Sequence, residues 1–172
     1  MKNNIVLIGM PSCGKSTVGV VLAKAMGYRF VDSDLVIQER TGKLLSEIIE
    51  EQGQAAFNQI ENDINASLEY EKAIIATGGS VIYGIEAMEH LRSIGIVVYI
   101  DLPLEQLQER IGDLNARGVS MKEGQSFEEL FKERKPLYEK YADITIHANG
   151  LSIREVVHKL KENLQNYNDM VN

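Results

Sequence analysis

The sequence predicts an α/β fold built on a five-stranded parallel sheet with helices on both faces. Two features of the 172-residue chain support this prediction. Five short segments are almost continuously apolar, as expected of strands that are buried on both sides. The segments between them carry apolar residues at the three- and four-residue spacing of helices. Strands that alternate with helices in this way are typical of a parallel sheet covered on both faces.

The predicted strands and helices follow one another along the chain. The strand segments read "IVLIG", "RFVDSD", "AIIATGG", "GIVVYIDLP" and "ITIHA". A helix follows the first strand through "KSTVGVVLAKAMG", which ends in a glycine that can terminate it. Further helices are predicted at 34–40, 45–51, 54–70, 84–93, 103–111, 126–141 and 151–165. Because ligands bind at the carboxyl ends of parallel strands, we expect function to depend on the loops 9–16, 32–34 and 77–81.

Length, composition and charge indicate a single globular domain over residues 1–172. Apolar residues make up 44% of the chain and charged residues 25%, which is typical of a folded protein. The formal net charge of −7 leaves no electrostatic footprint for nucleic acid, and no basic amphipathic helix suggests a membrane surface. We therefore expect a small-molecule partner, no nucleic acid, no membrane and a monomer.

Cysteine and histidine content indicate a cytoplasmic protein without a structural metal. Cys13 is the single cysteine, so no internal disulfide can form. The three histidines lie far apart and lack metal-ligand spacing. The N-terminus, "MKNNIVLIGMPS", has only a short apolar run and does not resemble a secretory signal. A nucleophilic role for Cys13 is disfavoured, because no histidine is near in sequence to act as its base.

The segment "GMPSCGKST" at residues 9–17 predicts a phosphate-binding loop. Gly9, Gly14, Lys15 and Ser16 match the pattern G-x-x-x-x-G-K-[ST] directly between a strand and a helix. In such a loop the backbone N–H groups face one anion, the lysine reaches the β- and γ-phosphates, and the serine ligates Mg²⁺. A turn that binds nothing is the alternative, and it would leave the lysine without a partner. The other loop residues expected to contact ATP are Pro11, Ser12, Cys13 and Thr17.

The motif "VDSD" at residues 31–34 predicts a second binding loop. Asp32 and Asp34 would lie on the same side of an extended strand end, where one carboxylate can help hold hydrated Mg²⁺ and the other can orient a hydroxyl. The alternative is that Asp34 only caps the next helix. The absence of an N-K-x-D guanine-reading segment favours a small phosphotransferase over a GTPase. The polar segment 112–126 then fits a mobile lid, with a plain surface loop as the alternative.

Five segments together resemble the shikimate kinase family in order, spacing and total length. They read "GMPSCGKSTVGVVLAKAMGYRFVDSDLVIQERTGKLLSEII", "FNQIE", "ATGGSVI", "ERIGDLNARG" and "ERKPLYEKYAD". The resemblance covers about residues 4–160. It implies a P-loop kinase of the nucleoside-monophosphate-kinase type, which uses ATP to phosphorylate a ring hydroxyl of shikimate in the aromatic pathway.

The resemblance also implies roles for individual residues around the phosphates. Lys15, Ser16 and Asp32 would serve ATP and Mg²⁺, with Ser16 and Asp32 at the metal. Asp34 would bind the acceptor hydroxyls, beside a glycine turn at Gly78 and Gly79. Lys15 and Asp34 are therefore expected to be catalytic.

Three arginines complete the implied site. Arg110 would stack on adenine, the catalytic Arg117 in the lid would close on the transferring phosphoryl group, and Arg134 would pair with the substrate carboxylate. The alternative for each arginine is a solvated charge on a helix surface.

Three positions of the acceptor half depart from the family pattern. Asn58 stands in place of an arginine, Ser80 in place of a third glycine, and Gly118-Val119 in place of a proline and a leucine after the lid arginine. We expect Asn58 and Ser80 still to contact the substrate, and shikimate to bind weakly. Two further readings stay open: a kinase of another small polyhydroxy compound, and a nucleotide-binding protein without catalysis.

Overall fold

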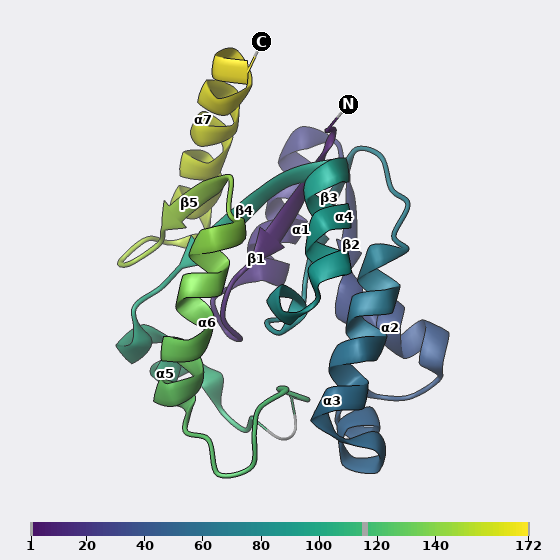
Figure 1. Cartoon of the computed structure of the whole chain (residues 1–172). Coiled ribbons are helices and arrows are strands. Elements are labelled where there is room, and N and C mark those ends of the chain that lie inside the picture. Colours follow the sequence, from purple (N-terminus) through teal and green to yellow (C-terminus); the bar gives the residue numbers. More distant parts are fainter. Residues whose placement is uncertain (1, 115–116, 172) are drawn as a thin grey trace.

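The computed structural model describes residues 2–114 and 117–171, which form one parallel sheet with helices on both faces (Figure 1). The five strands lie in the order β2-β3-β1-β4-β5, and all neighbouring strands are parallel. Their bounds are Asn4–Ile8 (β1), Arg29–Asp32 (β2), Ala73–Ala76 (β3), Gly95–Asp101 (β4) and Ile144–His147 (β5). The predicted fold class is confirmed.

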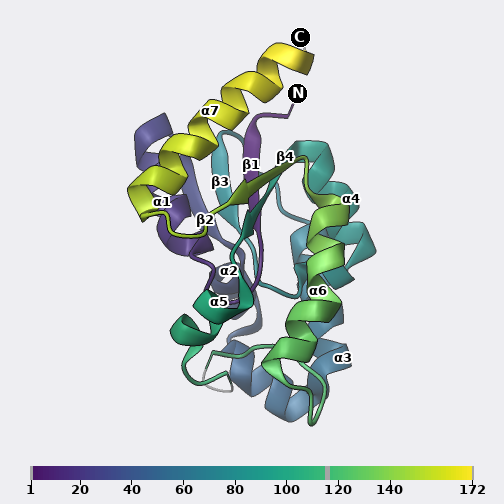
Figure 2. The same cartoon turned by 90° about the vertical axis from the view of Figure 1, so that its left-hand side faces the viewer.

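The helices cover the two faces of the sheet in separate layers. Figure 2 shows α1 and α7 on one face and α4 and α6 on the other. Among the described residues, no helix combines the length and the hydropathy needed to cross a membrane. The helix bounds are Lys15–Met26 (α1), Ser33–Thr41 (α2), Leu45–Ala66 (α3), Ile85–Ile94 (α4), Leu104–Ile111 (α5), Phe127–Tyr141 (α6) and Ile153–Val171 (α7), with a short 3₁₀ helix, η1, at Val81–Tyr83.

Helix α3 spans both of the helices that the sequence predicts at 45–51 and 54–70. Gly53 (φ 84°, ψ 169°) is non-helical and breaks the element where the sequence leaves a gap. This conformation is open to glycine and costly for other residues. The predicted end at residue 70 is wrong, because the hydroxyl of Ser67 donates to a carbonyl of the last turn and the helix stops at Ala66.

Two further boundaries differ from the prediction. Strand β2 ends at Asp32, so Asp34 belongs to the first turn of α2 and not to an extended strand. Helix α7 continues to Val171 instead of ending at residue 165, and its partly buried Tyr167 packs against the core beyond Leu164. In both cases a helix extends into residues whose local pattern is polar.

The three central strands supply the core. All residues of β1 and β3 are buried, as are the first six of β4. The edge strands β2 and β5 mix buried with partly or fully exposed residues. The central strands are covered by helices on both sides, which is why their segments are continuously apolar in sequence.

One polar residue ties the starts of the central strands together. Asn4 is 1% exposed, and its side-chain amide donates to the carbonyls of Tyr70 (2.6 Å) and Ile94 (3.1 Å). Its side-chain oxygen accepts from the backbone N–H of Ala73 at 3.0 Å. Tyr70 and Ala73 lie at the entry to β3 and Ile94 at the entry to β4, so Asn4 satisfies backbone groups of both neighbouring strands.

Replacing Asn4 with alanine should lower the free energy of unfolding by about 2–4 kcal/mol, because it leaves buried backbone groups without partners. For a chain of this length the corresponding decrease in Tm is roughly 5–15 °C, measurable by circular dichroism. Asn3→Ala at the adjacent, half-buried position is the matched control and should change Tm much less. Equal Tm values for the two variants would contradict the role given to Asn4.

Candidate active site

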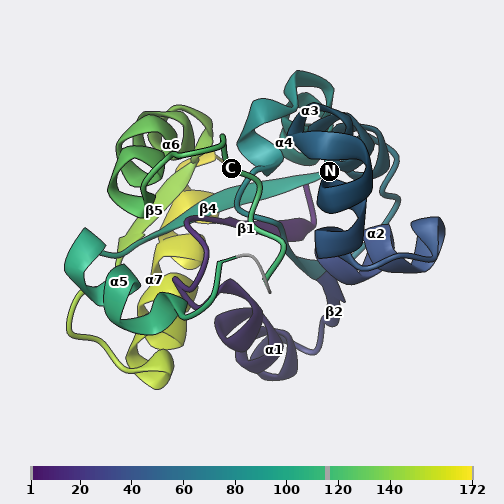
Figure 3. The same cartoon turned by 90° about the horizontal axis from the view of Figure 1, so that it is seen from below.

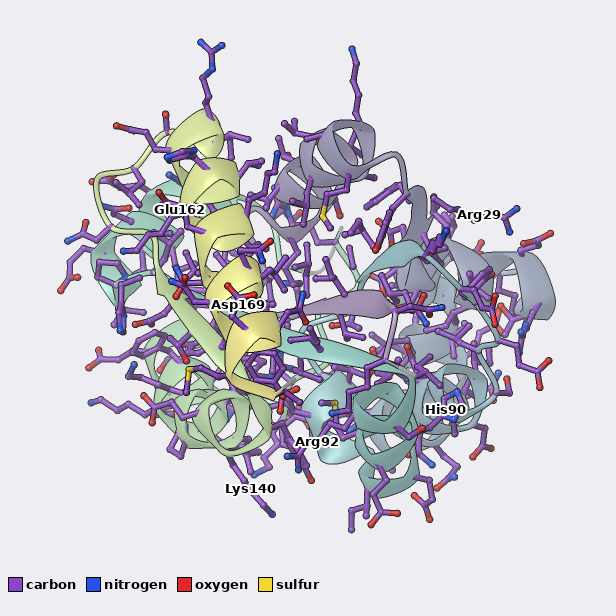
Figure 4. All side chains as sticks on the ribbon, turned by 90° about the horizontal axis from the view of Figure 1, so that it is seen from above. Arg29, His90, Arg92, Lys140, Glu162 and Asp169 are labelled. Atoms are coloured by element: carbon purple, nitrogen blue, oxygen red, sulfur yellow. The ribbon has the colours of Figure 1, made fainter. Side chains whose placement is uncertain are left out.

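A cavity of about 630 Å³ opens at the carboxyl end of the sheet, where the loops after β1, β2 and β3 meet. Figure 3 looks onto this end and shows the stretch that leads into α6, residues 117–126, passing over the strand ends. Every predicted site residue lines the cavity except Gly9, Cys13 and Asn58. Figure 4 shows the opposite end of the molecule, where the side chains of Arg29 and Lys140 extend outward from the protein surface.

The loop between β1 and α1 has the backbone shape that its glycines predict. Gly14 has a φ of 99°, in the region that favours glycine. A Cβ on Gly9 would lie 2.8 Å from the carbonyl oxygen of Ile100 and 2.8 Å from the sulfur of Cys13. Helix α1 begins at Lys15, so the positive end of its dipole faces the cavity. Loop and helix together can hold an anion.

Lys15 has partners within the protein, contrary to the expectation from sequence. It is 8% exposed, and its Nζ donates to the carbonyl oxygens of Gly9 (2.8 Å) and Met10 (2.9 Å). The carbonyls of the loop itself thus compensate the ammonium group. Burial of this lysine does not by itself require a phosphate, so the case for phosphate binding depends on the motif and the loop geometry.

Ser16 and Asp32 bring two oxygen ligands together at the cavity wall. The Ser16 hydroxyl donates to Oδ2 of Asp32 at 3.1 Å, and Oδ1 of Asp32 accepts from the backbone N–H of Asp34 at 3.0 Å. Asp32 is therefore the cap of α2, and the alternative that Asp34 fills this role is wrong. Hydroxyl and carboxylate oxygens suit Mg²⁺, which also keeps water and phosphate ligands. The described residues contain no group of three or more acidic, histidine or cysteine side chains that could hold a metal.

Asp34 forms an acidic pair with Glu61, a residue that the sequence analysis missed. A Cβ on Gly78 would lie 2.5 Å from Oε2 of Glu61 and 2.7 Å from Oδ1 of Asp34, so both carboxyl groups press against this glycine. Within the described residues these two oxygens are buried and have no hydrogen-bond partner. The other oxygen of Glu61 accepts from the Ser80 hydroxyl at 2.5 Å. Asp34 and Glu61 both line the cavity, where their carboxyl groups can hydrogen-bond with the hydroxyl groups of a ligand.

Burial gives the two carboxyl groups different charges at neutral pH. Burial, and then the nearby Asp34 carboxylate, raise the pKa of Glu61 to about 8 against the opposing effects of Ser80, Arg134 and Lys15. Burial, and then the charge of Asp32, raise the pKa of Asp34 to about 6, while Lys15 lowers it. Near pH 7 Asp34 is mainly ionised and Glu61 mainly protonated, so the pair carries one negative charge.

Arg134 supplies a buried positive charge opposite the acidic pair. It is 1% exposed and lies under the glycine turn, where a Cβ on Gly79 would be 2.8 Å from its Nη1. Its Nη2 donates to the carbonyl oxygen of Ser120, and its guanidinium carbon is 5.5 Å from the ring centre of Tyr83. Its Nε has no partner among the described residues. This arrangement suits an anionic group of a ligand.

The lid segment, residues 117–126, contacts the phosphate loop through Arg117 and helix α3 through Ser120; residues 115 and 116 of the predicted lid are outside the described residues. Arg117 is exposed and its Nη1 donates to the hydroxyl of Ser12 in the phosphate loop. Arg110, at the end of α5, is exposed and lines the cavity nearby. Both arginines line the cavity, and their contacts with ATP stay a prediction.

Asn58 lies behind the cavity wall. Its Oδ1 accepts from the Ser120 hydroxyl at 2.8 Å, and it is Ser120 that lines the cavity. Ser80 does line the cavity, although its hydroxyl points to Glu61. Asn58 and Ser80, two of the departures from the family pattern, each have a hydrogen-bond partner within the protein.

These features define the class of the protein. A phosphate loop, a Mg²⁺-compatible pair of oxygen ligands, an acidic pair and a buried guanidinium surround one cavity at the carboxyl end of a parallel sheet. A P-loop kinase that acts on a small molecule has this arrangement.

The chain belongs to the shikimate kinase family, whose profile matches residues 11–165. It is 40% identical over 163 residues to a shikimate kinase of Clostridium botulinum, covering 94% of this chain and 97% of the relative. Among solved structures it is similar to the shikimate kinase of Acinetobacter baumannii in complex with shikimate, with a TM-score of 0.84, 34% identity and coverage of 95% and 93%. The shikimate kinase of Aquifex aeolicus gives a TM-score of 0.81 at 34% identity, covering 94% of this chain and 96% of that one.

Glu61→Gln should stabilise the protein increasingly as pH rises. The pKa of Glu61 is about 8 in the folded protein and near 4.5 when unfolded, so the unfolded chain loses this proton first and stability falls from about pH 4.5 to about pH 8. Glutamine has no such proton to lose. The Tm of the variant relative to wild type should therefore increase by several degrees between pH 5 and pH 8.5 in calorimetry.

Glu89→Gln, at an exposed glutamate of α4, is the matched control and should give a Tm difference that does not change with pH. Asp34 titrates in both wild type and the Glu61 variant, so its contribution largely cancels from the comparison. A pH-independent Tm difference for Glu61→Gln would show that this carboxyl group titrates normally in the folded protein.

Proposed function

We propose that this protein transfers the γ-phosphoryl group of ATP to a hydroxyl of shikimate, giving shikimate 3-phosphate and ADP in the pathway to chorismate and the aromatic amino acids. The observation that carries the proposal is the meeting of Lys15, Asp34 and Arg134 at one cavity in a chain of this family. Lys15 can bind a phosphate group, Asp34 can accept a hydrogen bond from a hydroxyl group, and Arg134 can bind an anionic group.

The nucleotide half of the proposal depends on the phosphate loop. Backbone N–H groups of the loop and the N-terminus of α1 would hold the phosphates, and Lys15 would exchange its carbonyl partners for phosphate oxygens. Ser16 and Asp32 would hold Mg²⁺. When bound, the ion would supply positive charge to the phosphate oxygens during transfer.

The acceptor half depends on Asp34 and Arg134. Asp34 is mainly ionised at neutral pH, so it can accept a hydrogen bond from the attacking hydroxyl and receive its proton. Glu61, mainly protonated, adds no second negative charge that would repel an anionic acceptor. Arg134 supplies a buried guanidinium at the cavity that can pair with the carboxylate of shikimate.

Two exposed arginines have proposed roles on the nucleotide side. Arg117 would move from Ser12 onto the transferring phosphoryl group as the mobile part of the predicted lid and would help to exclude water, while Ser120 stays held by α3 and α6. Arg110 would stack on the adenine ring. We further propose that the 172-residue chain acts as one domain and as a cytoplasmic monomer.

A second candidate is a kinase of another small polyhydroxy compound. Asn58 favours it, because an uncharged residue at this position leaves Arg134 as the one buried guanidinium at the acceptor end of the described cavity. An acceptor with less negative charge than shikimate would need no second arginine. A non-catalytic role is disfavoured, because Lys15, Asp34 and Arg117 all line the cavity.

A coupled assay of ADP release tests both candidates. With ATP and Mg²⁺, shikimate should stimulate ADP release by the wild-type protein, and other polyols and hydroxy acids should not. Lys15→Ala should reduce kcat at least about a hundredfold, because it removes a charge that stabilises the transferring phosphoryl group. Lys24→Ala, at an exposed lysine of the same helix, is the matched control and should retain activity.

The outcomes separate the candidates. Stimulation by a different polyol and not by shikimate would establish the second candidate. Full turnover by Lys15→Ala, with any acceptor, would contradict the assignment of the phosphate loop.

A further inference from the structure

Asn58 and Ser120 connect helix α3 to the lid segment by a hydrogen bond of 2.8 Å between side chains. Ser120 is 2% exposed and lines the cavity, whereas Asn58 lies behind it. The carbonyl oxygen of the same serine accepts from Nη2 of Arg134. Ser120 is thus fixed from α3 through its hydroxyl and from α6 through its carbonyl.

The packing of Gly118 presses the same stretch of the lid segment onto α3. Gly118 is buried and has a φ of 64°. A Cβ at this position would lie 2.7 Å from Cβ of Leu45 and 3.0 Å from the backbone nitrogen of Ser46. Glycine therefore lets the lid backbone reach the start of α3, two residues before the Asn58–Ser120 hydrogen bond.

These contacts also determine how the Arg134 guanidinium is oriented. One of its N–H groups is used by the Ser120 carbonyl, Nη1 lies under Gly79, and Nε is left without a partner among the described residues. A guanidinium is planar, so fixing one N–H fixes the directions of the others. Displacement of Ser120 would therefore redirect the donors that Arg134 presents to a ligand.

We propose that Asn58 and Ser120 are a positioning pair for the acceptor: Asn58 holds Ser120, and Ser120 holds both the cavity wall and Arg134. The inference rests on the proposed function and names residues that set the affinity for an anionic acceptor within that site. An arginine at position 58 would bring a charge to the ligand. Asn58 instead acts through its partner, so its contribution is to geometry and not to charge.

A double-mutant cycle tests this pair with Asn58→Ala, Ser120→Ala and the double variant. Each single variant should raise the KM for shikimate roughly 3- to 10-fold, the range expected for one neutral hydrogen bond, with kcat and the KM for ATP changed less than about twofold. The double variant should be no worse than either single variant, because both remove the same hydrogen bond. Gln59→Ala, at the exposed neighbouring position of α3, is the matched control and should leave all constants unchanged.

Hydrogen exchange provides a readout that does not need an acceptor. Amides of residues 118–121 in the ligand-free protein should exchange faster in both single variants and equally fast in the double variant, while those of α7 should not change. If shikimate fails to stimulate the wild-type enzyme, the proposed function fails, and the exchange data still decide whether the pair exists. Multiplying effects in the double variant, a loss confined to kcat, or unchanged exchange would overturn the proposal.

Discussion

The cavity depends on how closely three charged or ionisable side chains approach the glycine pair that follows β3. Glu61 and Asp34 press on Gly78, and Arg134 presses on Gly79. A side chain at either glycine would occupy the space of these groups. The turn is held in place from the other side, since Tyr138 donates to the Gly79 carbonyl at 2.6 Å. The acidic pair and Arg134 can therefore lie close to each other, because the glycine backbone between them carries no Cβ.

This arrangement costs stability and keeps polar atoms available. Burying a carboxyl group or a guanidinium without full hydrogen bonding is unfavourable. Protonation of Glu61 reduces the cost, because Asp34 then remains the single negative charge of the pair. The unpartnered atoms of Asp34, Glu61 and Arg134 all belong to residues that line one cavity, and a hydroxylated anion has complementary donors and acceptors. The site thus resembles a binding surface whose missing hydrogen-bond partners are supplied by the ligand.

The sequence predicts the parts of this protein that depend on local pattern. The central strands are recognisable because strands buried on both faces must be apolar throughout, and the phosphate loop because its glycines and lysine occur at fixed spacing. Spacing alone could not decide whether Asp32 or Asp34 caps α2, since the outcome depends on the residue at which β2 gives way to α2. Helix boundaries of this kind are set by capping contacts.

The contribution of α3 to the site depends on which face of this helix turns inward. Glu61 lies four residues after the buried Phe57, so helical geometry puts both on the same face, and this signal was available in the sequence. Asn58 is one residue further round the helix and meets the lid segment instead. That contact joins positions 62 residues apart, and no local pattern encodes it. The same limit applies to Lys15, whose carbonyl partners depend on the curvature of the loop.

Asn4 gives the sheet a common origin at the end farthest from the cavity. Its contacts fix the height at which β3 and β4 start beside β1, and from that level each strand advances about 3.3 Å per residue. The number of residues in a strand then determines how far its carboxyl end lies from the level of Asn4. Adding or removing one residue in β1 or β3 would shift the phosphate loop relative to the glycine turn by about one such step. Strand length, measured from this single asparagine, is therefore part of the catalytic geometry.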